Sequence, residues 1–170
     1  MPFKVDADTV AKFSVLNSIT GEYITYDLQK ELEINEYQLE DQMMEHASKY
    51  ALWSSYSVVA ERYERSCETE LEVAEANADS LAREQLKARG ITKPTVGQVN
   101  SEIALNEDVY AAKTKLSEAK GYASSLKYIL KAFDARKDLL INISAQRRKE
   151  MELTGQGDRK STRLNSSHSH

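Results

Sequence analysis

The sequence contains few of the residues that break helices or cross-link chains. Its 170 residues include six glycines, two prolines and one cysteine. So few glycines and prolines exclude a fold built from many tight turns, such as a β-sandwich or barrel. The single cysteine, Cys67, cannot form a disulfide within the chain, so we expect it to be a small core group in a reducing compartment.

Long apolar runs are also missing. No run comes near the ~18 residues that span a bilayer, and no basic start leads through an apolar stretch to a small-residue cleavage site. The longest candidate, residues 50–60, mixes serines and tyrosines with its apolar residues. We therefore expect a soluble cytoplasmic protein that has no membrane partner.

The signatures of enzymes are missing as well. The sequence has no phosphate-binding glycine loop, dinucleotide fingerprint, nucleophile motif or paired-cysteine metal site. A di-metal site in a helical bundle needs a Glu three residues before a His, but Met43 holds that position before His46. We expect His46 to be an ordinary surface or seam residue, and the sequence predicts no catalytic residue, metal or cofactor.

What the sequence does contain is long uninterrupted helical segments. The first extends from Asn35 to Arg89 without proline or glycine. Asn35 is placed to cap its start, with Gln38 completing a capping box and Ile34 packing on Leu39 as a hydrophobic staple. About 55 residues would make one helix roughly 80 Å long.

A second helical segment, residues 106–151, follows a short linker. Gly90 and Pro94 end the first helix. Thr95, with Gln98 as a second capping box, and Asn106 resemble N-caps of further helices. Apolar residues recur through the second segment at alternating three- and four-residue spacing, which is typical of a coiled-coil seam. The first segment shows a shorter matching run at Cys67, Leu71, Ala74, Ala78 and Leu81. Two such helices joined by a short linker should fold back antiparallel.

The predicted fold is therefore all-α. Residues 1–26 form an N-terminal extension with a short helix near residues 9–16, and residues 27–151 form a helical hairpin with short extra helices. Residues 152–170 are expected to be a disordered tail. A two-helix hairpin cannot bury both apolar stripes, so we expect it to assemble into a helical oligomer.

The basic tail is set aside in the functional argument. Residues 158–168, DRKSTRLNSSH, resemble the in-frame translation of a standard sequencing-library adapter, and a natural disordered tail is the alternative. On the first interpretation the natural C-terminus is expected to be missing. Without residues 158–170 the chain has 20 positive and 26 negative side chains, a net charge of −6.

Charge is unevenly divided between the two long segments. Residues 35–89 hold 12 acidic and 6 basic side chains, whereas residues 106–151 hold 10 basic and 6 acidic ones. An acidic helix beside a basic one needs no ligand to explain it, because surface ion pairs of under ~1 kcal/mol each select register and partner.

Aromatic residues recur along both helical segments. Trp53 and several tyrosines, including Tyr56 and Tyr122, follow helical spacing. Bases can stack on such rings, but the spacing favours core or subunit packing.

One cluster of cations stands out against the acidic background. It surrounds the expected turn between the two helices, and antiparallel folding is expected to bring two lysines of the second helix alongside it. Its members are Arg83, Lys87, Arg89, Lys93, Lys113 and Lys115. The helix dipole accounts for one or two of these cations. The surplus indicates a phosphate-binding surface, which a ring of subunits would repeat.

Several strings resemble the UvsY-type recombination mediators of T-even-like phages. They are DLQKELEIN at 27–35, YALW at 50–53, LKAR at 86–89, and the run from LNEDVY to LLINI at 105–143. Together they span about residues 27–150, and their order and spacing carry more weight than any single string.

The resemblance implies a non-enzymatic, ring-shaped homo-oligomer that binds single-stranded DNA. Family members help to displace a single-strand-binding protein and load a RecA-like recombinase, in the host-cell cytoplasm for a phage protein. The family's basic pair in the LKAR string matches Lys87 and Arg89. Arg83 replaces one of them if the register shifts, because the linker is shorter here than in the family's best-known member.

Two other functions stay open. A coiled-coil chaperone or phage assembly scaffold would use an exposed seam to grip polypeptides. An unrecognised enzyme would reveal itself by a stoichiometric bound metal or cofactor.

Overall fold

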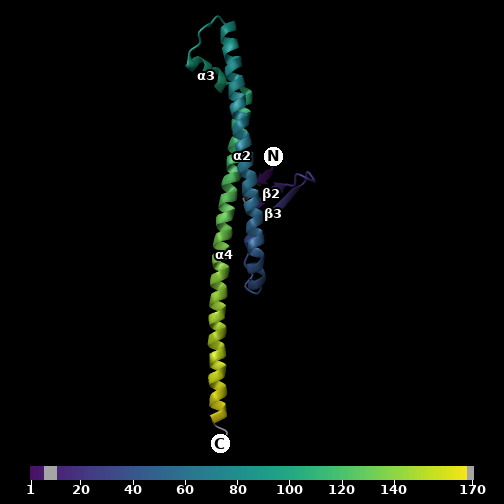
Figure 1. Cartoon of the computed structure of the whole chain (residues 1–170), viewed down its shortest axis with the longest axis vertical. Coiled ribbons are helices and arrows are strands. Elements are labelled where there is room, and N and C mark those ends of the chain that lie inside the picture. Colours follow the sequence, from purple (N-terminus) through teal and green to yellow (C-terminus); the bar gives the residue numbers. More distant parts are fainter. Residues whose placement is uncertain (6–10, 168–170) are drawn as a thin grey trace.

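A long antiparallel helical hairpin dominates the structure (Figure 1). The computed structural model describes the backbone of residues 1–5 and 11–167, with side chains as far as residue 163. The elements in chain order are β1 (Phe3–Val5), β2 (Lys12–Leu16), β3 (Tyr23–Asp27), α1 (Leu28–Leu32), α2 (Leu39–Ala88), α3 (Val96–Ala104) and α4 (Glu107–Ser167). The predicted helical hairpin is confirmed, although a small sheet accompanies it.

The N-terminal segment forms strands where a short helix was expected. β1, β2 and β3 make an antiparallel sheet in that order, with Phe3 opposite Val15 and Phe13 opposite Tyr26. Residues 12–16 are therefore strand, and the prediction of a helix there is wrong; residues 9 and 10 lie outside the described residues. Apolar and polar residues alternate in KFSVL, a period that suits a half-buried strand.

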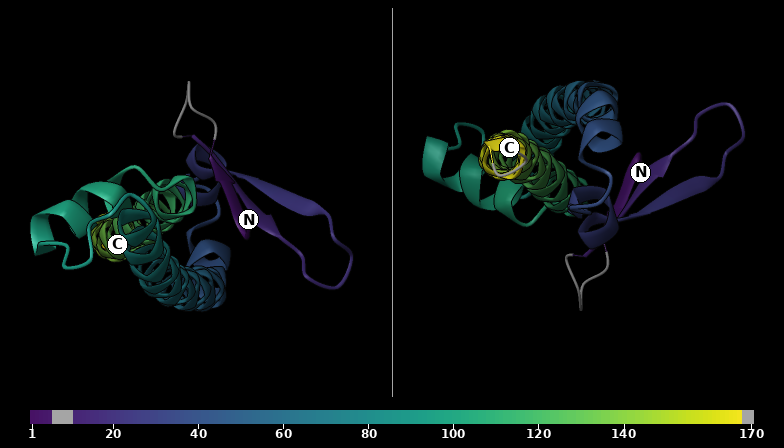
Figure 2. Two further views of the ribbon diagram at one scale, coloured as in Figure 1. Left: turned by 90° about the horizontal axis from the view of Figure 1, so that it is seen from above. Right: turned by 90° about the horizontal axis from the view of Figure 1, so that it is seen from below.

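The sheet completes the core of the hairpin. The core contains Phe3, Phe13 and Val15 of the sheet, Trp53 of α2 and Phe133 of α4. The Phe13 and Trp53 rings meet edge-on, with 5.9 Å between their centres. Trp53 is fully buried. Two helices alone leave large aromatic side chains exposed at their margin, so the sheet supplies the third wall. The end-on views place the sheet and α3 on opposite sides of the helix pair (Figure 2).

The start of α2 differs from the prediction by three residues. Asn35 does not cap the helix; its Oδ1 accepts a hydrogen bond from the Tyr37 amide at 3.0 Å and closes a local turn. The helix begins at Leu39, and the Gln38 side chain makes no capping bond. A side chain that bonds its own backbone two residues later competes with helix capping, which explains the shift.

The other helix ends agree with the sequence. α2 ends at Ala88, and Gly90 follows with φ of 89°, a conformation that costs other residues more. Thr95 and Gln98 form the expected capping box at the start of α3. The Asn106 Oδ1 accepts from the Val109 amide at 3.1 Å, which caps α4. These signals are local, so the fold did not override them.

α4 is longer than expected. It continues to Ser167 and passes well beyond the start of α2 (Figure 1), whereas residues 152–170 were predicted to form a disordered tail. Residues 150–163 are all exposed. Hydrogen bonds of Thr154 and Thr162 to the helix backbone four residues earlier are among the local contacts of this segment. In the described part of the chain, no helix combines the length and apolar character needed to cross a membrane.

Candidate nucleic-acid interface

The tip of the hairpin is held by a small core of its own. Ala82 and Leu86 of α2 are buried against Val99 of α3, with Ile91 and Ile103 packed around them. This cluster folds α3 back onto the end of α2. The predicted tip cations are therefore carried by a packed turn.

Two of the predicted cations project freely from this turn. Lys87, in the last turn of α2, and Lys93, in the connection to α3, are both exposed. No acidic side chain in the described residues lies within 4.0 Å of either ammonium group. Both are therefore available to phosphate groups.

Two other tip cations already have acidic partners. Arg89 donates to Glu102 of α3 at 2.8 Å, and Arg83 donates to Asp79 one turn earlier at 2.7 Å. The hydrogen bond to Asp79 raises the pKa of Arg83. Both arginine side chains stay more than half exposed, so an incoming phosphate meets an ion pair whose positive charge is already neutralised in part.

The remaining two predicted residues do not reach the tip. Lys115 donates to both oxygens of Glu70, at 2.8 and 3.1 Å, and this hydrogen bond raises its pKa. Glu70 lies 17 residues before Lys87, or about 25 Å along α2. The expectation that Lys113 and Lys115 lie beside the tip cations is therefore wrong. The reason is α3, which occupies the tip and delays the return of the chain to Glu107.

The seam of α2 also differs from the expected one near the tip. The sequence predicted a seam through Cys67, Leu71, Ala74, Ala78 and Leu81; Cys67 and Ala78 are buried, but Leu81 is 45% exposed. Ala82 and Leu86 take the buried positions instead. Burial also raises the pKa of Cys67, so its thiol stays protonated in the core.

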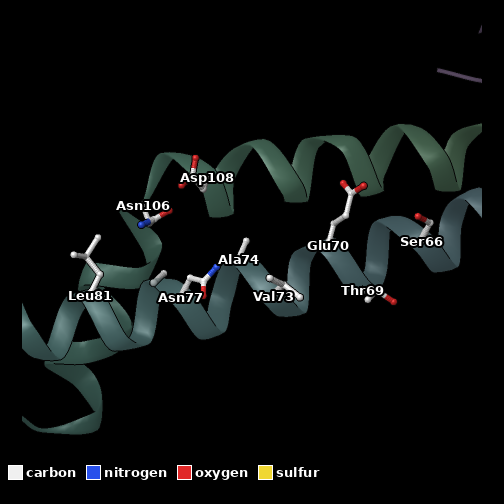
Figure 3. A pocket seen from close by; sticks show the side chains of 10 residues that line it. Ser66, Thr69, Glu70, Val73, Ala74, Asn77, Leu81, Asn106 and Asp108 are labelled. Atoms are coloured by element: carbon white, nitrogen blue, oxygen red, sulfur yellow. The ribbon is translucent and has the colours of Figure 1, made fainter.

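Leu81 faces an open apolar groove beside the start of α4 (Figure 3). The groove measures about 540 Å³. Its lining includes the apolar residues Val73, Ala74 and Leu81 of α2 and the polar residues Glu70, Asn77 and Asp108. Val73 is 55% exposed. Such a groove suits apolar side chains of another polypeptide better than phosphate.

A buried cation was missed by the sequence analysis. Arg136 of α4 is only 3% exposed, and its Nη1 lies 2.9 Å from the Nδ1 of His46 while its Nε donates to the Glu33 carbonyl at 3.3 Å. His46 is thus a buried seam residue. A signal was present, because Arg136 lies seven residues after Ile129 and four before Leu140, which are both buried.

The electrostatics of this pair assign its protonation. Burial lowers the pKa of His46, and the neighbouring cations Arg136 and Lys137 lower it further. Burial also lowers the pKa of Arg136, which stays far above neutrality. Neutral His46 therefore accepts from Arg136 at Nδ1. Arg136 of α4 thus links the Glu33 carbonyl, which follows α1, to His46 of α2, and its role is structural.

The described residues contain no cluster of three or more His, Cys, Asp or Glu side chains arranged to hold a metal ion. Comparison of the chain with protein-family models, with curated proteins and with solved structures gives no match.

Proposed function

We propose that this protein is a non-enzymatic, oligomeric mediator that binds single-stranded DNA and helps to load a RecA-like recombinase in place of a single-strand-binding protein. The observation that carries the proposal is that Lys87 and Lys93, on a packed tip, are exposed and form no ion pair with an acidic side chain of the described residues. Arg89 adds a third cation whose pairing with Glu102 fixes its position. The resemblance to the UvsY-type family supports the same conclusion.

Oligomerisation is part of the proposal because one tip offers few phosphate contacts. Repeating the tip around a ring multiplies these contacts and raises the effective affinity. Leu52, Val59 and Val73 are each at least 40% exposed. They lie at seven- and fourteen-residue spacing, so they share one face of α2, and an exposed apolar row of this kind supports self-association.

Titration of labelled oligo-dT at several salt concentrations tests the DNA-binding step. The variant Lys87→Gln with Lys93→Gln should bind on the order of tenfold more weakly at 50 mM salt, because each lost phosphate contact lowers the slope of log affinity against log salt by about 0.7 for a single strand. Lys12→Gln with Lys30→Gln is the matched control, since these exposed lysines lie on β2 and α1. Equal binding by the tip variant and the control would refute the site assignment.

The mediator step needs its own measurement. A RecA-like recombinase is added to DNA covered by a single-strand-binding protein, and filament assembly is followed in time. The protein should shorten the lag before assembly, and the tip variant should not. A parent protein that binds oligo-dT but leaves the lag unchanged would limit the function to DNA binding.

The groove beside Val73 and Leu81 favours a second candidate, a coiled-coil chaperone or phage assembly scaffold that grips polypeptides. This function would appear as suppressed aggregation of a client protein together with no binding to oligo-dT. Leu81→Gln should then abolish the suppression of client aggregation, since it places a polar amide in the lining of the groove.

A further inference from the structure

A row of lysines runs along α4, away from the tip. Lys113, Lys120, Lys127 and Lys131 are all exposed. Neighbours in the row lie seven or four residues apart, so they share one helix face. The first and last lysines of the row are 18 residues apart, about 27 Å along the helix. It is therefore a straight, extended set of positive charges.

The row lies on the side of α4 that faces away from the sheet. Tyr122 lies on the sheet side of α4, because the centre of its ring is 5.5 Å from that of the Phe3 ring in β1. Lys120 precedes Tyr122 by two residues, so the two side chains point about 160° apart around the helix. The sheet therefore leaves the row uncovered.

Acidic side chains are scarce on α4 beside the row. Between Val109 and Phe133 the sequence contains a single acid, Glu118. Glu118 lies four residues before Tyr122, so it shares the sheet side of α4 with that tyrosine. Within the described residues no carboxylate lies within 4.0 Å of the four ammonium groups, in contrast to Lys115 with its partner Glu70.

Two exposed tyrosines flank the row. Tyr110 is 73% and Tyr128 is 70% exposed, and they are 18 residues apart, so they project in the same direction after five helical turns. The Lys131 ammonium lies 5.5 Å from the centre of the Tyr128 ring. The residues between the lysines on this face are small; they are Ser117, Gly121 and Ser124. The face thus combines aromatic rings and cations with small residues that leave space between them.

We propose that this lysine row is a second contact surface for single-stranded DNA, with phosphates along the lysines and bases against Tyr110 and Tyr128. The inference rests on the proposed function and extends it from the tip to the shaft of the hairpin. Nonspecific single-strand binding combines a positive track with stacking platforms, and both are present on this face.

A subunit contact fits this face less well. Among the described residues of 107–138, the two tyrosines are the only large hydrophobic side chains that are exposed. The cores of protein interfaces are depleted of lysine. The exposed aliphatic residues suited to such a core, such as Leu52, Val59 and Val73, are on α2 and not on this face of α4. The row therefore favours a polyanion over a second copy of the chain.

The test compares two double variants of the full chain in oligo-dT titrations. Lys120→Gln with Lys127→Gln should weaken binding on the order of tenfold at 50 mM salt. Loss of two contacts should also reduce the steepness of the log–log salt dependence by about 1.4. Lys12→Gln with Lys30→Gln removes the same charge on the sheet side and should change neither quantity as much. Light scattering without DNA should give the same mass for all three proteins.

Each outcome separates the two proposals. A parent that binds oligo-dT while the row variant matches the control overturns the row alone. A parent that does not bind oligo-dT overturns the proposed function and the row with it. A change in oligomer mass in the row variant without DNA identifies a subunit contact and overturns the inference.

The choice of ligand is tested with Tyr128→Leu. Loss of the ring should weaken binding to oligo-dT but not to duplex DNA, whose bases cannot stack on it. Equal effects on both ligands would overturn the assignment of the tyrosine as a stacking platform.

Discussion

The two halves of the helical hairpin are built differently. Around Trp53 and Phe133, α2 and α4 are joined by a sheet, and aromatic rings fill a three-walled core. Toward the tip, the helices meet through small residues such as Cys67, Ala78 and Ala119, and their outer faces stay open. The covered half supplies stability, and the tip of the open half offers the first surface proposed to bind DNA. The lysine row begins in the open half and continues into the covered half, on the side of α4 away from the sheet.

The largest expected effect breaks the covered half. Trp53→Ala removes the side chain that joins the sheet to both helices, and truncating a buried aromatic residue costs about 3–5 kcal/mol. Urea unfolding should show this loss, and near-ultraviolet circular dichroism should show loss of the aromatic packing signal. Oligo-dT binding at low temperature should survive in any folded fraction, because the tip has its own core. A loss below about 1 kcal/mol would contradict the role given to the sheet.

A smaller effect is expected at the tip. Gly90→Ala forces a side chain into a left-handed conformation, φ of 89°, at a cost of about 1–2 kcal/mol. An added Cβ meets no atom within 4 Å there, so the cost is one of backbone conformation alone. Gly121→Ala is the matched control, since that helix-interior glycine also has open space and should gain up to about 1 kcal/mol. If thermal unfolding gave both variants the same sign, the left-handed cap would be disproved.

The smallest effect concerns pH and the covered half. The pKa of His46 is lowered in the folded protein, so between that pKa and its ordinary value of about 6.5 the unfolded chain binds more protons. Stability should therefore be complete above pH 6.5 and fall as the pH drops through this window. Urea midpoints between pH 5.5 and 7.5 measure the slope. His46→Gln should flatten it, and an unchanged slope would assign the effect to another group.

Local signals in the sequence predicted much of the hairpin. The Thr95 capping box, the Asn106 cap and the glycine at position 90 each depend on residues within a few positions of one another. The predicted start of α2 was wrong for a reason that is also local, because the Asn35 side chain accepts from the Tyr37 amide and does not cap the helix. Short-range chemistry thus accounts for both the success and the error.

The candidate site was harder to predict because it depends on contacts between elements. Nothing in the spacing of Arg89 and Glu102 reveals that α3 folds back to pair them. The same helix keeps Lys115 away from the tip and opposite Glu70. The lysine row on α4 was visible as a seven-residue repeat, but its freedom from carboxylates required the packed structure.

The sequence by itself determined that two long helices form and turn at Gly90, because propensity, periodicity and capping act within a few residues. Only the tertiary structure decided which side chains stay free. The sheet covers one side of the hairpin, α3 occupies its tip, and carboxylates from other helices pair with Arg89 and Lys115. These outcomes depend on which surfaces meet in space, and such contacts join residues that lie far apart in the chain.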